Sequence, residues 1–238
     1  MNILPIKTKI MQPPQDDLYK ELGIVLPELK NKDVLVVSSK VVAIHEGRCL
    51  DKTVTSKKDL VASEADVIIE RPYWPAPLTI TRGAFIGAAG IDESNSGDYF
   101  TMLPKDAFES ASKLWSYLTN KYNLTELGIV ITDSRSLPLR YGATAVSIGW
   151  WGIVPLQDHI GKADLFGREM QYERSNIVDG IAAAAGLVMG EVAECTPIVL
   201  VRDIPSIQFT EHSTKDDIFS PFEDDTFRVL YERFFPPK

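Results

Sequence analysis

Six short apolar runs rich in β-branched residues constrain the fold of this chain more than any other feature of its sequence. Each is five or six residues long and bounded by turn residues, which is typical of buried strands. They lie at 33–38, 66–70, 78–82, 128–132, 144–149 and 197–202. Apolar residues at helical spacing predict helices over 17–22, 106–120, 175–189 and 225–234. Because strands and helices are interspersed without strict alternation, we expect an α+β fold rather than a doubly wound sheet.

Composition narrows the class of protein. The chain has 25 Lys and Arg against 33 Asp and Glu, a net charge of −8, which argues against a nucleic-acid binder. No apolar run approaches the ~20 residues that span a bilayer, and no signal peptide is evident. We therefore expect a cytoplasmic protein with no membrane association. We expect residues 1–238 to form a single module, in which the Pro-rich stretch 71–77 is either an ordered connection or a boundary between two subdomains.

Several common catalytic signatures are absent. The sequence has no GxxxxGK[ST] phosphate loop, no HExxH zinc motif and no GxSxG nucleophile elbow. The three histidines are isolated, and two cysteines are too few for a disulfide framework. The remaining candidates for a functional site are carboxylate and hydroxyl side chains, whose oxygen atoms can bind a metal ion.

The segment 128–140 combines a buried strand with polar side chains. Asp133, Ser134 and Arg135 follow one another as the apolar run ends, and Arg140 comes shortly after. Carboxylate and hydroxyl oxygens are the ligands that Mg²⁺ prefers, and arginine binds phosphate or carboxylate groups. The alternative is a solvated turn with a local ion pair.

Three more segments have a similar character. The turn at 90–95 carries Asp92 and Asn95, and 161–169 carries Arg168, while hydroxyls and Lys40 follow the strand at 33–38. Each segment also has a purely structural interpretation: an Asx turn at 90–95, a surface ion-pair network at 161–169 and a capped loop after the strand at 33–38. Two acids brought together repel each other unless a cation neutralises them, so Asp92 and Asp133 together predict a metal site.

Read in order, these segments resemble the coenzyme F-420-0:γ-glutamyl ligase family. The resemblance covers most of the chain between residues 33 and 202. The matching stretches are DVLVVSSKVV to EGR at 33–48, GIDESN at 90–95, ITDSR at 131–135, RYGATAVSIG at 140–149, DLFGRE at 164–169 and LVMGE at 187–191.

The resemblance implies an α+β fold with mixed sheets flanked by helices, and an intertwined homodimer with the active site near its interface. It implies Mg²⁺ or Mn²⁺ as metal, GTP or ATP as cosubstrate, and L-glutamate and a carboxylate acceptor as substrates. It carries metal-binding roles onto Asp92, Asp133 and Ser134, with Gln208 as a weaker candidate. Nucleotide-binding roles fall on Lys9, Ile10, Met11, Gln12, Ser39, Lys40 and Asn95.

Three departures from the family pattern concern the nucleotide. Ile44 stands where the family usually has a lysine, and residues 9–12 lack the usual Leu-Pro-rich character. After Arg202 the chain reads DIPSIQF where a glycine-rich nucleotide loop is expected. These departures leave GTP and ATP both open.

The resulting hypothesis is a ligase that activates an acceptor carboxylate as an acyl phosphate, which the amine of glutamate then attacks. Arg135 and Arg140 would hold phosphate or acidic groups of the acceptor, and Arg168 the carboxylates of glutamate. The acceptor would be coenzyme F-420-0-like or folate-like. A glutamate ligase acting on a peptide or protein C-terminus is the first alternative. A metal-dependent phosphohydrolase or a nucleotide-binding protein is the second.

Overall fold

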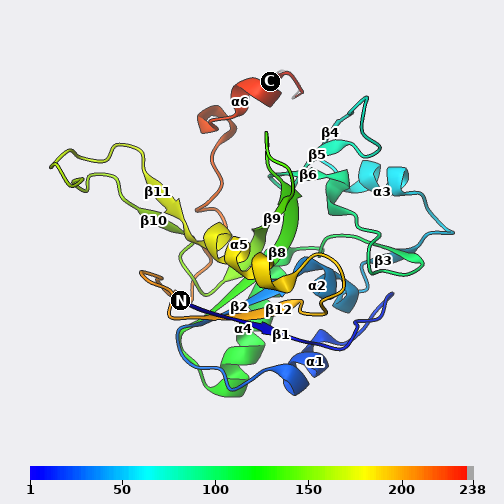
Figure 1. Cartoon of the computed structure of the whole chain (residues 1–238), viewed down its shortest axis with the longest axis horizontal. Helices are drawn as coiled ribbons and strands as arrows, with labels where there is room; N and C mark the ends of the chain where they lie inside the picture. The colour runs from blue at the N-terminus through cyan, green and yellow to red at the C-terminus, as the bar shows by residue number, and fades with distance from the viewer. Residues whose placement is uncertain (235–238) are drawn as a thin grey trace.

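The computed structural model describes residues 1–234 and is built around a five-stranded sheet (Figure 1). Strand β2 pairs in parallel with β8, and every other pairing is antiparallel. This mixed sheet agrees with the expected α+β class. The strands, in spatial order, are β1 (Asn2–Ile6), β12 (Ile198–Arg202), β2 (Asp33–Ser38), β8 (Leu127–Ser136) and β9 (Ala143–Trp151).

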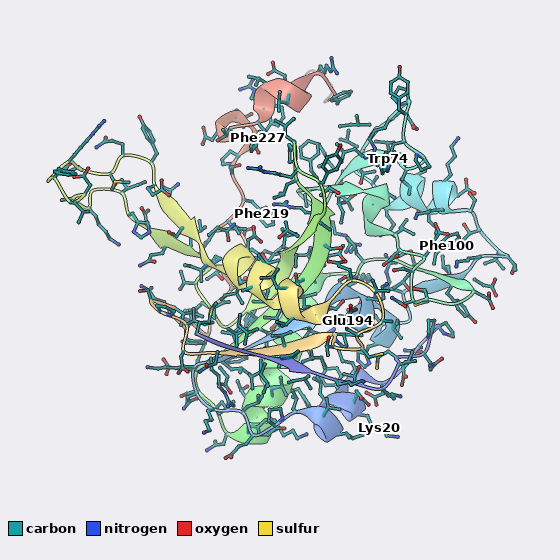
Figure 2. The ribbon with its side chains drawn as sticks, in the orientation of Figure 1. Lys20, Trp74, Phe100, Glu194, Phe219 and Phe227 are labelled. Atoms are coloured by element: carbon teal, nitrogen blue, oxygen red, sulfur yellow. The ribbon has the colours of Figure 1, made fainter. Side chains whose placement is uncertain are left out.

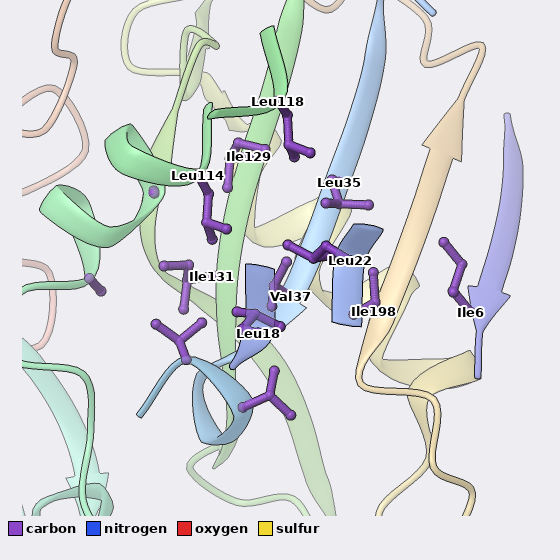
Figure 3. Packing of buried hydrophobic residues seen from close by; sticks show 14 of the residues in the cluster. Ile6, Leu18, Leu22, Leu35, Val37, Leu114, Leu118, Ile129, Ile131 and Ile198 are labelled. Carbon is purple, nitrogen blue, oxygen red and sulfur yellow. The ribbon is translucent and has the colours of Figure 1, made fainter. Parts of the chain in front are cut away.

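Helices cover both faces of this sheet. One face packs against α1 (Leu18–Val25), α2 (Ser39–His45) and α4 (Ala107–Tyr122), and the other against α5 (Ile177–Met189). In β2, Leu35 and Val37 enter the first core (Figure 3), while Val34 and Val36 enter the second. Because successive strand side chains point to opposite faces, a strand buried on both sides must be continuously apolar.

The predicted helix ends at 106 and 189 have a local physical cause. The carboxylate of Asp106 accepts hydrogen bonds from the backbone N–H groups of Phe108 and Glu109, at 2.9 and 3.1 Å, and thereby caps α4. Helix α5 stops before Gly190, whose φ of 76° few other residues adopt readily.

Smaller sheets flank the main one. Strands β4 (Val67–Ile69), β5 (Leu78–Thr81) and β6 (Ala84–Gly87) form an antiparallel unit beside α3 (Lys57–Glu64). The stretch 71–77 joins β4 to β5, which pair with each other, so it is the loop of a hairpin. The division of the chain into subdomains stays a prediction.

Two further strand pairs complete the structure. Strand β3 (Cys49–Asp51) pairs with β7 (Tyr99–Thr101), and β10 (Leu156–Asp158) pairs with β11 (Arg174–Asn176). The second pair, with the residues between its strands, projects away from the sheet in Figure 1, and we call residues 156–176 the arm. Within residues 1–234, no helix has both the length and the apolar character needed to cross a bilayer.

The prediction of one continuous helix over 225–234 is wrong. Helix α6 is only Arg228–Tyr231, and short 3₁₀ turns lie at Phe222–Asp224 and Glu232–Phe234. The carboxylate of Asp225 accepts a hydrogen bond from the backbone N–H of Phe227 at 2.7 Å. This local turn competes with the helix that the apolar spacing favours.

Candidate active site

The sheet brings four distant segments to one of its edges. The last residue of β1, Ile6, pairs with Ile198 at the start of β12, and Ile198 pairs in turn with Val37 near the end of β2. Ser38 at that end pairs with Thr132 of β8. Four stretches of chain therefore meet at the same edge of the sheet. They are the segments that follow β1 and β2, the segment that precedes β12, and the end of β8.

A pocket of about 550 Å³ opens at this edge. Nine of the residues singled out in the sequence line it. They are Lys9, Ile10, Met11, Gln12, Lys40, Asp92, Asn95, Asp133 and Ser134. Ser39 lies directly behind the wall, where its hydroxyl donates a hydrogen bond to Asp133 Oδ1 at 2.9 Å. Segments separated by more than 90 residues thus share one cavity.

Asp133 lies partly buried on β8, past a bulge between Ile131 and Thr132. Burial raises the pKa of this carboxyl to about 6, and the nearby charge of Asp92 adds to the effect. The hydrogen bond from Ser39 and the charge of Lys40 act in the opposite direction without cancelling it. A bound cation would relieve the unfavourable charge that burial imposes on this carboxylate.

Asp92 is held differently. Its Oδ2 forms an ion pair with Lys40 Nζ at 2.6 Å, and the backbone N–H of Ser94 donates to its Oδ1 at 2.7 Å. Burial opposes ionisation of Asp92, but the contacts with Lys40 and Ser94 outweigh it, so the pKa of Asp92 lies below its usual value. Two backbone hydrogen bonds between Asp92 and Thr101, one donated by each residue, fix the position of Asp92.

The oxygen atoms of this pocket suit a hard divalent cation. Asp92 and Asp133 supply carboxylates and Ser134 a hydroxyl, all of the ligand type that Mg²⁺ and Mn²⁺ take. Within residues 1–234, no three acids, histidines or cysteines are grouped closely enough to bind a metal by themselves. The remaining ligands would therefore be water or substrate oxygens, as is usual for Mg²⁺.

The predicted nucleotide-binding residues take part in internal contacts. Asn95, with φ of 52°, donates a hydrogen bond from Nδ2 to the carbonyl oxygen of Val192 at 2.7 Å. Lys9 pairs with Asp16 at 2.8 Å, while Met11 is 5 % exposed and belongs to the core. Residues 9–12 thus form one wall of the pocket, with Met11 anchoring it.

Besides Ser39, four predicted site residues do not line the pocket. Arg140 and Arg168 are exposed on projecting loops, and Gln208 follows β12, whose end lies at the opposite edge of the sheet. This topology keeps Gln208 away from Asp92 and Asp133. Arg135 lies two residues beyond Asp133 on the same face of β8, and its buried Nε has no hydrogen-bond partner.

One wall of the pocket was missed by the sequence reasoning. The loop between α5 and β12, residues 190–197, contributes Glu191, Val192 and Glu194 to the lining. Figure 2 labels Glu194 on this loop. Thr196 closes α5 by donating a hydrogen bond to the carbonyl oxygen of Met189 at 2.8 Å. The acids directly after the helix stop at Gly190 are the signal in the sequence, whereas the family resemblance predicts a nucleotide loop after Arg202.

Comparison with known proteins identifies relatives along most of the chain. Residues 5–203 match the family model described as F420-0:γ-glutamyl ligase. A coenzyme F420:L-glutamate ligase from Halorubrum lacusprofundi is 33% identical over 84% of this chain and 86% of its own length. Proteins of the same name from Methanocaldococcus jannaschii and Methanococcus maripaludis are 31% and 28% identical, over 84% and 96% of this chain and 86% and 97% of their own lengths. This chain belongs to the F420-0:γ-glutamyl ligase family.

Proposed function

We propose that this protein is a metal-dependent ligase that uses a nucleoside triphosphate to join L-glutamate to a carboxylate of a coenzyme F420-type acceptor. The observation that carries the proposal is the pocket in which Asp92, Asp133 and Ser134 meet Lys40 and residues 9–12. The names of the relatives support glutamate and an F420-type acceptor as substrates.

The chemistry follows from the energetics of amide formation. A free carboxylate does not react with an amine at neutral pH, so the acyl group must first be activated. In the proposed reaction, an acceptor carboxylate oxygen attacks the γ-phosphorus and the nucleoside diphosphate leaves, which gives an acyl phosphate. The amine of glutamate then attacks the acyl carbon, loses a proton and expels phosphate.

The residues of the pocket have distinct tasks in this reaction. A divalent metal held by Asp92, Asp133 and Ser134 would offset the negative charge on the transferring phosphoryl group. Lys40 supplies a further positive charge for the phosphates. Arg135 lies beside the pocket and not in its lining, and it is suited to a carboxylate of the acceptor or of glutamate, because its buried Nε–H without a partner is unfavourable until an anion arrives.

Charge in the pocket also favours a second copy of the chain. Lys9 and Lys40 are each paired with a carboxylate, and the lining carries four acids, namely Asp92, Asp133, Glu191 and Glu194. A triphosphate would therefore benefit from a cation beyond the metal and Lys40. We infer a homodimer in which Arg168, on the projecting arm, reaches the pocket of the partner subunit.

A single assay tests the proposed function. Purified protein is incubated with GTP or ATP, Mg²⁺, L-glutamate and a panel of acceptors comprising F420-0, a folate and a peptide. We expect glutamate-dependent phosphate release and a glutamyl mass gain on F420-0. A glutamyl mass gain on the folate or the peptide would instead identify that compound as the acceptor. Phosphate release without glutamate would indicate a phosphohydrolase.

Two variants make the assay specific to the site. Asp133→Asn should lower ligation by at least a hundredfold, because the amide cannot replace a charged metal ligand. Asp98→Asn is the matched control, since Asp98 is an exposed acid near Asp92 that does not line the pocket, and it should retain wild-type turnover. Unchanged turnover in Asp133→Asn would contradict the metal role.

A further inference from the structure

The ammonium group of Lys40 is fully engaged within the protein. Its Nζ contacts Asp92 Oδ2 at 2.6 Å, the carbonyl oxygen of Ser94 at 2.6 Å and the hydroxyl oxygen of Ser94 at 3.0 Å. An ammonium has three N–H donors, so these three acceptors satisfy it completely. The contacts join the first turn of α2 to the 92–95 turn across the pocket.

This arrangement conflicts with metal binding at Asp92. A divalent ion would bind Asp92 at about 2.0–2.1 Å, through a carboxylate whose Oδ2 already contacts the ammonium and whose Oδ1 accepts from Ser94. The divalent ion and the ammonium together would bring three positive charges to one carboxylate, and these charges repel each other strongly in a partly desolvated pocket. The ammonium therefore competes with a metal ion for Asp92 and weakens metal binding for as long as it stays in place.

Lys40 has the means to move. Its Cα lies just after the end of β2, and four rotatable side-chain bonds allow Nζ to shift by several ångströms without a change in the backbone. Moving the charge into solvent would leave the Ser94 oxygens without their donor. A triphosphate bound in the same pocket offers the anion that the displaced ammonium needs.

We propose that Lys40 is an internal stand-in cation, which neutralises Asp92 in the empty pocket and transfers to the phosphates when metal and nucleotide bind together. The proposal rests on the proposed function and adds a coupling mechanism to it. Metal alone must compete with Lys40, whereas nucleotide removes the competitor. Linkage then requires that metal and nucleotide each raise the affinity for the other by the same factor.

Direct metal titration tests this mechanism without turnover. Mn²⁺ affinity of the full chain is measured by calorimetry, with and without a β,γ-imido GTP analogue. In the absence of nucleotide, Lys40→Met should bind Mn²⁺ at least tenfold more tightly than the wild type. The analogue should raise the affinity of both proteins, because its phosphate oxygens are metal ligands, but the factor for the wild type should be at least threefold larger than that for Lys40→Met.

A neighbouring ion pair provides the matched control. Lys57 pairs with Glu93 at 2.9 Å, one residue from Asp92, and neither residue lines the pocket. Lys57→Met removes the same charge from the same neighbourhood, so its Mn²⁺ affinity should stay within twofold of the wild type. An equal gain in both variants would reduce the effect to general electrostatics and overturn the proposal.

Other outcomes separate this proposal from the proposed function. If the wild type binds Mn²⁺ and ligates glutamate but Lys40→Met binds Mn²⁺ no more tightly, only the stand-in role fails. If the wild type binds no Mn²⁺ with or without the analogue, the metal site itself fails. Should Lys40→Met not fold, a crystal structure of the wild type with Mn²⁺ and the analogue decides: Nζ on a phosphate oxygen supports the proposal, and Nζ still on Asp92 overturns it.

Discussion

Asp133 is a residue at which burial and charge oppose each other. Its pKa of about 6 exceeds the ~3.9 of an unfolded chain, so between these values the folded protein binds more protons than the unfolded one. The free energy of unfolding therefore falls as pH rises from about 4 to 6. At neutral pH the ionised carboxylate lowers the stability of the metal-free protein.

Asp133→Asn should consequently stabilise the metal-free protein at pH 7.5 by about 1–3 kcal/mol. The amide oxygen can still accept the hydrogen bond from Ser39, while the desolvated charge is gone. Urea unfolding in EDTA at pH 5, 6 and 7.5 checks this. The wild type should lose stability relative to the variant as pH rises, and parallel profiles would contradict the argument.

The sequence identified individual site residues where an apolar strand or turn ended in an acid. Asp92 and Asp133 were both found in this way, and the structure places them in one pocket. Their role as metal ligands stays a prediction. Gln208 was a weak candidate from the family resemblance, but β12 runs antiparallel to β2 and ends at the other edge of the sheet. Side-chain chemistry was visible in the sequence, but the direction of each strand was not.

Helix α5 offers a contrast between two glycines on one element. A Cβ at Gly186 would lie 2.5 Å from Ala145 Cβ of β9, whereas a Cβ at Gly180 would meet nothing within 4 Å. Gly186→Ala should destabilise the protein by about 1–3 kcal/mol, because the helix must move off the sheet. Gly180→Ala should stabilise it by about 0.5–1 kcal/mol, because alanine favours the helix.

Thermal unfolding of the two variants, measured side by side, tests this packing. Both substitutions add one methyl group to the same helix, so any difference reports the contact with β9. Equal effects would show that α5 does not pack against Ala145 as closely as described.

Some strands could be predicted from the sequence more accurately than others, and the difference has physical causes. The strands at 33–38 and 197–202 were predicted to within one residue, since burial on both faces leaves an unbroken apolar run. Strand β8 continues to Ser136, because the polar residues that ended the predicted strand still pair with β9. Strand β1 was not predicted; it contains Pro5, which is tolerated because β1 lies at the edge of the sheet.

At the scale of the whole molecule, the arm carries an unusual amount of exposed apolar surface. Leu165 and Phe166 at its tip are 99 % and 96 % exposed. In the proposed homodimer these side chains are covered by the partner subunit, since isolated apolar side chains at the tip of a projecting arm gain stability from burial.

Sedimentation at micromolar concentration should accordingly give twice the 26.5 kDa chain mass for the wild type. Replacing Leu165 and Phe166 together by aspartate should yield the monomer mass and lower ligation, because Arg168 no longer reaches the other pocket. Ile24→Asp, an exposed substitution at the other end of the fold, should leave the dimer intact. A monomeric wild type would contradict the proposal.

The pairing of β1 with β12 joins the first residues of the chain to a strand that ends at residue 202. The pocket wall formed by residues 8–13 directly follows β1, and the wall formed by residues 190–197 directly precedes β12. During translation, the amino-terminal strand therefore has no partner until most of the polypeptide has left the ribosome. The pocket cannot be complete until residues 198–202 have been synthesised, because both of its walls depend on the strand that they form.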